Sequence, residues 1–198
     1  MQKYFKERFD FKMRKSKNMV YTITCVGIMA ALCFVGFYYL KIEIPMYSRA
    51  FHFGNTFMLV GALLFGGLRG GTAAAIGMSM ADIFTANYAI FAPGTFICKF
   101  IGGFVCGKIA YGKDRNGEDY AYNATGAAVG GLIQMILSLI NVIITNMLAG
   151  SSYQVELTNA LLSLPMVTFL LITSIVIAVP LAMVINKSLI SSGLKNKF

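Results

Sequence analysis

Six apolar runs, each long or nearly long enough to cross a lipid bilayer, dominate this sequence. A membrane-spanning helix needs roughly 20 apolar residues, with a range of about 17 to 25. Charged residues make up only 13% of the 198 residues, against about a quarter in a typical soluble domain. We therefore expect an all-α membrane protein with six transmembrane helices. The expected spans are residues 19–40, 53–68, 71–87, 92–111, 122–148 and 160–187.

The segments outside these runs are short, so we expect one membrane domain with two small extensions. Residues 19–192 form the six-helix domain, residues 1–18 a basic amphipathic arm and residues 193–198 a cytoplasmic tail. The second and third spans meet at "GGLRGG" (66–71), where glycines permit a tight turn. The first run is too long for the core of a signal peptide, and no small-residue cleavage site follows it.

Lysine and arginine are distributed unevenly along the chain. Fourteen of the seventeen fall in segments that share one side of the membrane if both termini are cytoplasmic. Cytoplasmic loops carry an excess of these residues, so we expect both termini inside. The arm at residues 1–18 could bind nucleic acid, but the membrane helix that follows directly favours a place on the inner leaflet. We expect no nucleic-acid partner.

The sequence holds little that an enzyme or a metal centre would need. Its four cysteines lie inside apolar runs without CxxC spacing, and its single histidine is His52. It has no phosphate-binding loop, nucleophile elbow or HExxH motif. We therefore expect no enzymatic activity, no bound metal and no cofactor.

Two charged residues, Asp82 and Lys99, fall inside the expected spans. A charged side chain costs about 2.5–3.5 kcal/mol or more at the bilayer centre. Both residues lie at a similar depth in the outer half, so we expect them to pair or to line one wet cavity. Alternatively, Lys99 extends its long side chain outward to the lipid headgroups.

A polar stripe on the fifth expected helix favours the cavity. Gln134, Ser138, Asn141 and Thr145 are spaced by four, three and four residues, which places them on one helical face. Such a stripe either hydrogen-bonds neighbouring helices or lines a polar site. Because two charges lie in the same outer half of the membrane, we favour the binding site.

The expected outer loops add aromatic and polar side chains. The segment "KIEIPMYSRAFHFGNT" (41–56) places a phenylalanine on each side of His52, and we expect it to fold over the bundle as a lid. His52 either contacts a ligand or only satisfies the backbone. The segment "ANYAIFAPG" (86–94) contributes Tyr88 and Phe91. Aromatic faces beside amides suit a small flat heterocycle.

Two stretches carry a family resemblance: "HFGNTFMLVGALLFGGLRGGTAAAIGMSMADIF" (52–84) and "YAIFAPGTFICKFIGGFVCG" (88–107). They resemble the substrate-binding membrane subunit, or S component, of energy-coupling factor vitamin transporters. Within that superfamily they are most similar to the riboflavin-type branch, which extends to pyridoxine and hydroxymethylpyrimidine carriers. The similarity covers about residues 19–187. The H-x-G-N and A-P-x-T-x-x-x-K patterns are fairly specific to the branch but do not fix the vitamin.

The resemblance implies a subunit of the bacterial plasma membrane that captures a vitamin at the outer face. It passes the vitamin inward by toppling in the bilayer, driven by a transmembrane scaffold subunit and two cytoplasmic ATPases. We expect a pyridoxine-like or hydroxymethylpyrimidine-like ligand, with riboflavin as the alternative. A ligand-free membrane scaffold is the alternative from another class, and an intramembrane enzyme ranks third. The expected substrate-binding residues are His52, Asn55, Asp82, Tyr88, Thr95, Lys99, Asn141 and Thr145.

The resemblance also implies a docking surface on the first helix. Family members contact the scaffold subunit through small residues at an A-x-x-x-A spacing. The matching stretch here is "CVGIMAALC" (25–33), which contains Gly27, Ala30 and Ala31. The same spacing often serves packing inside a helical bundle, and Gly103-x-x-x-Gly107 on the fourth expected helix repeats it.

Overall fold

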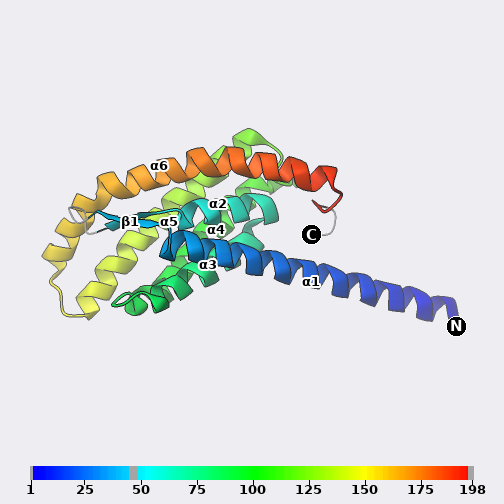
Figure 1. Ribbon diagram of the computed structural model, residues 1–198, viewed down its shortest axis with the longest axis horizontal. Helices are drawn as coiled ribbons and strands as arrows, with labels where there is room; N and C mark the ends of the chain where they lie inside the picture. The colour runs from blue at the N-terminus through cyan, green and yellow to red at the C-terminus, as the bar shows by residue number, and fades with distance from the viewer. Residues whose placement is uncertain (1, 45–48, 196–198) are drawn as a thin grey trace.

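Six α-helices and one short β-hairpin build the chain (Figure 1). This computed structural model describes residues 2–44 and 49–195, and side chains at 19–42 and 51–195. Single 3₁₀ turns at Ala89–Phe91 and Gly112–Asp114 connect some of the helices. The α-helices are α1 (Gln2–Tyr38), α2 (Gly54–Phe65), α3 (Gly67–Phe84), α4 (Ala92–Ala110), α5 (Tyr120–Leu148) and α6 (Tyr153–Ser191).

Four helical segments are long and apolar enough to cross a membrane, which confirms the expected all-α membrane class. Within the described chain these segments are Met19–Tyr38, Ala89–Ala110, Tyr120–Leu148 and Tyr153–Ser191. Helix α2 has only 12 residues, which at 1.5 Å per residue gives about 18 Å. The hydrocarbon core of a bilayer is about 30 Å thick, so α2 alone does not cross it.

The expected second and third spans form a tight pair of helices, α2 and α3. Gly66 separates them with a φ of 81°, a left-handed conformation that favours glycine. Its backbone N–H donates to the Ala62 carbonyl oxygen at 3.0 Å. A Cβ atom on Gly70 would lie 2.4 Å from the Ala62 Cα, so the two helices touch through their backbones. The turn expected at "GGLRGG" lies at Gly66 alone, and α3 begins at Gly67, earlier than the third span was expected to begin.

Helices α3 and α4 pack through paired glycines. A Cβ atom on Gly107 would lie 2.2 Å from the backbone nitrogen of Gly67, and one on Gly103 would lie 2.8 Å from the Cα of Gly71. Small residues spaced by four allow this close approach in membrane helices. The pattern at Gly103 and Gly107 therefore serves packing inside the bundle.

A β-hairpin occupies the end of the bundle away from the chain's N-terminus (Figure 1). Strand β1 (Lys41–Ile44) pairs antiparallel with β2 (Arg49–His52), and Lys41 lies opposite His52. The Phe53 N–H donates to the Gly36 carbonyl oxygen on α1 at 3.0 Å. The centroid of the Phe51 ring lies 6.0 Å from that of the Phe169 ring on α6. The segment expected as a lid is thus a hairpin held between α1 and α6.

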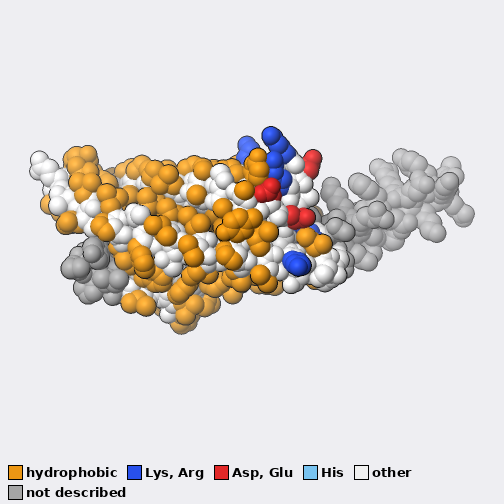
Figure 2. Space-filling model, turned by 90° about the horizontal axis from the view of Figure 1, so that it is seen from above, with side chains coloured by type: hydrophobic (Ala, Val, Ile, Leu, Met, Phe, Trp, Pro, Cys, Tyr) orange, Lys and Arg blue, Asp and Glu red, His pale blue; other side chains and the backbone are white. Residues whose placement is uncertain are grey.

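Charged side chains gather at the opposite end, whereas apolar side chains cover the rest of the face in Figure 2. Helix α1 runs as one helix from Gln2, but the side chains of the expected amphipathic arm lie outside the described residues. Residues 196–198 of the expected tail lie outside them as well. Helix α6 begins at Tyr153 and has 39 residues, or about 58 Å, so it extends beyond the apolar run expected at 160–187.

Candidate ligand-binding site

A cavity of about 290 Å³ opens between α1, β2, α3, α4 and α5, at the hairpin end of the bundle. Small-molecule sites in proteins have volumes of about 300–1,000 Å³, so this cavity has room for a small ligand. Aromatic, amide, hydroxyl and charged groups share its wall. The lining residues are Phe37, His52, Asp82, Tyr88, Phe91, Thr95, Lys99, Ser138, Asn141, Val142 and Asn146.

Asp82 and Lys99 line this cavity together, although they lie on different helices. Asp82 is 2% exposed and Lys99 is 5% exposed. The alternative that Lys99 extends outward to the lipid headgroups is therefore wrong. Among the described residues no ion pair joins the two side chains. Thr95 is placed to donate a hydrogen bond to the Asp82 carboxylate, but the Asp82 Oδ2 atom is buried and has no partner within the described chain.

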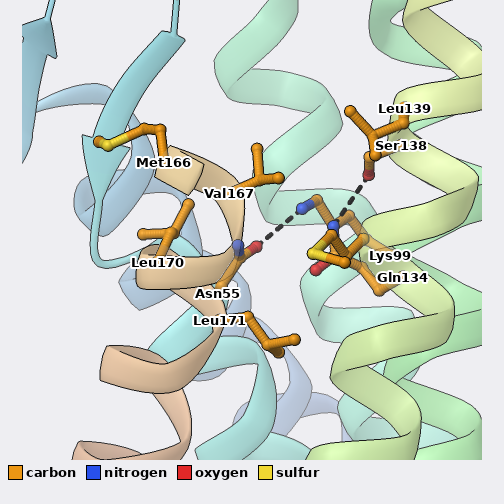
Figure 3. A pocket seen from close by; sticks show the side chains of 10 residues that line it. Asn55, Lys99, Gln134, Ser138, Leu139, Met166, Val167, Leu170 and Leu171 are labelled. Atoms are coloured by element: carbon orange, nitrogen blue, oxygen red, sulfur yellow. Dashed lines mark hydrogen bonds between the residues drawn. The ribbon is translucent and has the colours of Figure 1, made fainter. Parts of the chain in front are cut away.

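Lys99 lies between the main cavity and a smaller one of about 80 Å³. Its Nζ donates to Asn55 Oδ1 at 2.7 Å, and Figure 3 shows this bond crossing from α4 to the start of α2. Gln134 Nε2 donates to Ser138 Oγ at 2.8 Å beside it. In the same view α6 contributes Met166, Val167, Leu170 and Leu171 to the apolar wall of the small cavity, and α5 contributes Leu139.

His52 forms part of the wall nearest α1. Its ring centroid lies 4.6 Å from that of Phe37. Burial, with a smaller contribution from the charge on Lys99, lowers the pKa of His52 to about 3, so the imidazole is neutral at physiological pH. Its Nδ1 atom is buried without a hydrogen-bond partner in the described part of the chain.

These unpartnered atoms favour a ligand. A buried polar atom left without a hydrogen bond costs about 1–3 kcal/mol, and two such atoms, His52 Nδ1 and Asp82 Oδ2, belong to residues that line one cavity. A bound molecule that supplies a donor to Asp82 and a partner to His52 would recover this cost. The wall is therefore suited to a polar ring with donors and acceptors on its edge.

Asn141 on α5 is held by the 3₁₀ turn before α4 and by a neighbour on α5. Its Nδ2 lies 3.5 Å from the Phe91 carbonyl oxygen, and Thr145 Oγ1 donates to Asn141 Oδ1 at 3.3 Å. A Cβ atom on Gly94 would lie 1.7 Å from Asn141 Oδ1, so the glycine of the A-P-G-T segment makes room for the amide. Thr145 is not among the lining residues and contacts the site through Asn141.

The structure brings most of the expected site residues together. Asn55 lines the small cavity and contacts the main site through Lys99, and Thr145 lies behind Asn141. The other six line the main cavity: His52, Asp82, Tyr88, Thr95, Lys99 and Asn141.

Two residues that shape the site were not predicted from the sequence. Phe37 on α1 lines the cavity, but it lies inside an apolar run where no sequence signal marks it. Glu156 on α6 is 5% exposed and accepts a hydrogen bond from Asn146 Nδ2 at 2.7 Å. It lies before the expected sixth span, and its position in the first turn of a long apolar helix is the signal that could have drawn attention to it.

A helical membrane bundle with a polar and aromatic cavity at one end is typical of a membrane protein that binds a small molecule. The family model for the S component of the ECF-type riboflavin transporter matches residues 17–187, and the chain belongs to this family. It is therefore a membrane-embedded S component of an energy-coupling factor transporter, a vitamin-binding subunit and not a member of an enzyme family. No curated protein and no solved structure matches the chain.

Proposed function

We propose that this S component captures a small heterocyclic vitamin or precursor, pyridoxine-like or hydroxymethylpyrimidine-like, for uptake driven by ATP hydrolysis in partner subunits. The observation that carries the proposal is the position of Asp82 and Lys99 in the wall of one cavity of about 290 Å³. This volume is at the lower end of the range for ligand sites and favours a single ring over a large ring system.

The chemistry of the wall matches such a ring. A hydroxypyridine or an aminopyrimidine presents O–H or N–H donors on one edge and an oxygen or nitrogen acceptor on another. Asp82 can accept from the donor edge, and Lys99 can donate to the acceptor edge. Tyr88 and Phe91, whose ring centroids are 5.9 Å apart, provide apolar surface for the ring faces. Asn141 and His52 complete the set of polar contacts, and Thr145 positions Asn141.

Riboflavin is the second candidate, because the matching family model is named for a riboflavin transporter. The main cavity alone offers little room for a three-ring system with a hydroxylated chain. The small cavity on the other side of Lys99 is lined by polar side chains of α2, α4 and α5 and by apolar ones of α5 and α6. A larger ligand would have to displace the Lys99–Asn55 hydrogen bond to use both cavities.

The bundle crosses the bilayer six times in this proposal, with both termini in the cytoplasm. The gathering of charged side chains at the end opposite the β-hairpin (Figure 2) supports this orientation, because cytoplasmic segments are enriched in Lys and Arg. The four long apolar segments supply four crossings. Helices α2 and α3 supply the other two crossings, and the β-hairpin precedes the short α2 at the outer end of the bundle.

The first test is to identify the small molecule that accompanies the protein. After gentle purification in detergent, the released ligand is identified by mass spectrometry. We expect a near-stoichiometric amount of pyridoxine, a related pyridine or a pyrimidine precursor. Recovery of riboflavin would favour the second candidate. An empty protein that no vitamin in a panel stabilises thermally would contradict vitamin capture and favour a ligand-free scaffold role.

Gly27 and Ala31 on α1 form our proposed docking surface for the transmembrane scaffold subunit. Both are exposed, and a Cβ atom on Gly27 would meet no described atom within 4 Å. Ala30 instead faces the bundle: a Cβ atom on Gly77 of α3 would lie 2.2 Å from the Ala30 carbonyl oxygen. A partner helix could therefore approach the α1 backbone closely at Gly27 and Ala31, with Ala30 supporting them from inside.

Gly27→Leu and Ala31→Leu should prevent co-purification with the scaffold subunit and the two ATPases. The added side chains hold a partner helix away from α1 but reach nothing in the ligand cavity, so vitamin affinity should stay within about twofold, or 0.4 kcal/mol. Val184→Leu, at a position on α6 that is 66% exposed, provides a control for added bulk. Normal assembly of both α1 variants would argue against this surface.

A further inference from the structure

A second large cavity, of about 340 Å³, lies at the end of the bundle opposite the ligand site. Its wall combines the end of α2, the start of α3, the α4–α5 connection and the end of α6. Helix α3 separates the two sites, because Arg69 near its start lines this cavity whereas Asp82 near its end lines the other. The two cavities share no lining residue.

The charge in this second cavity favours an anion. Arg69 and Lys195 both line it, and Glu118 is the acidic residue among its lining residues. Lys195 Nζ donates to the Asn116 carbonyl oxygen at 2.7 Å and to Asn186 Oδ1, and both acceptors are neutral. Within the described chain no carboxylate lies within 4.0 Å of the Lys195 ammonium. The wall thus holds two cationic groups and one carboxylate.

Burial makes the Lys195 charge costly. It lowers the pKa of Lys195, and the charge on Glu118 opposes this effect only in part. The ammonium also lies 5.4 Å from the centre of the Tyr111 ring, an attraction worth about 0.5–2 kcal/mol. An anion that reached Lys195 and Arg69 together would compensate this cost, and a guanidinium can hold two phosphate oxygens at once.

Apolar groups complete the wall and its surroundings. Leu64, Phe65 and Ile190 line the cavity beside the cations. Leu68 next to Arg69 is 65% exposed, and Leu194 next to Lys195 is 37% exposed. The cavity and its surroundings therefore combine cationic groups with apolar ones, as a phospholipid combines a phosphate with acyl chains. Basic pockets between membrane helices are known binding places for anionic headgroups.

We propose that this cavity binds the phosphate group of an anionic phospholipid, with Arg69 and Lys195 as the charged donors. Leu64, Phe65 and Ile190 contact the glycerol and the first part of the acyl chains. A soluble phosphate ester offers the same charged group without the apolar part, and the test below separates the two sources. The proposal does not depend on which vitamin the other cavity holds.

The test measures lipid binding to the full chain in detergent by native mass spectrometry. Phosphatidylglycerol is the probe, phosphatidylcholine the lipid control, and glycerol phosphate the soluble competitor. We expect phosphatidylglycerol to bind at least about tenfold more tightly than phosphatidylcholine, because the choline group neutralises the phosphate charge. Displacement of the lipid by millimolar glycerol phosphate would assign the site to a soluble phosphate ester, and its failure to displace would assign it to the lipid.

Two variants place the binding in this cavity. Arg69→Gln and Lys195→Gln should each weaken phosphatidylglycerol binding about tenfold or more, whereas Lys195→Arg should retain it. Glutamine keeps an N–H donor for the Asn116 carbonyl oxygen, which protects the fold. Lys187→Gln removes one charge from an exposed position on α6 and should have no effect. Equal binding of the two lipids, or full lipid binding by both Arg69→Gln and Lys195→Gln, would overturn the proposal. Vitamin binding, measured in parallel, reports on the other cavity.

Discussion

Lys99→Ala is expected to lower vitamin affinity about 100-fold or more while the protein still folds and inserts. Lys99 is 5% exposed, donates to Asn55 at 2.7 Å and lines both parts of the site. Truncating one partner of a buried charged contact costs about 2–5 kcal/mol, and about 3 kcal/mol corresponds to 100-fold. Isothermal titration with the identified vitamin measures the loss.

Two further variants separate a contact with ligand from a role in folding. Lys99→Met keeps most of the side-chain volume without the charge, so its affinity should be as low as that of Lys99→Ala. If Asp82 and Lys99 served only to stabilise the bundle, each alanine variant would lower the melting temperature and the double variant would recover part of the loss. That pattern, together with unchanged vitamin affinity, would refute the binding role of Lys99.

Gly107→Ala is expected to lower the stability of the bundle substantially, because the added methyl group meets backbone atoms of α3. The added Cβ atom would lie 2.2 Å from the Gly67 backbone nitrogen and 2.5 Å from the Gly66 carbonyl carbon. Backbone atoms cannot rotate away as a flexible side chain can, so α3 and α4 must separate. Overpacking costs about 1–3 kcal/mol and occasionally more; about 3 kcal/mol would lower the melting temperature by roughly 6–12 °C for a chain of this length.

Gly112→Ala is the matched control for Gly107→Ala. Gly112 follows the same helix, and a Cβ atom there would meet no described atom within 4 Å. The melting temperature of the Gly112→Ala variant in detergent, followed by circular dichroism, should stay near that of the unmodified protein. Equal stability of the Gly107 and Gly112 variants would show that α3 and α4 are farther apart than the structure places them.

The sequence predicted much of the candidate site because membrane burial makes polar residues conspicuous. Asp82, Lys99 and Asn141 stand out in apolar runs, and His52 is the single histidine of the chain. Hydrocarbon has no water to solvate such groups, so they must turn toward one another or toward a cavity. Whether Asp82 and Lys99 form an ion pair or only line one cavity could not be decided from the sequence, because the answer depends on distances of a few ångströms between different helices.

Other parts of the site have no comparable signal. Phe37 resembles every other aromatic residue in an apolar run, and Gly94 resembles an ordinary turn glycine until Asn141 is placed beside it. The sequence also does not show which pairs of small residues spaced by four face a partner and which pack inside the bundle. Gly27 and Ala31 are exposed, whereas Gly103 and Gly107 are buried against α3, although their spacing in the sequence is identical.

The sequence by itself determined the membrane class, the approximate positions of the helices and the concentration of polar groups near one end of the bundle. These follow from the cost of placing charges and unpaired backbone groups in hydrocarbon, which is local and can be read residue by residue. Only the tertiary structure decided that α2 has 12 residues and does not cross the bilayer alone, and that Lys99 donates to Asn55 and lines two cavities. It also decided that Arg69 and Lys195, which are 126 positions apart in the chain, line one cavity. Such contacts depend on how whole helices pack, and packing is a property of surfaces brought together and not of any single segment.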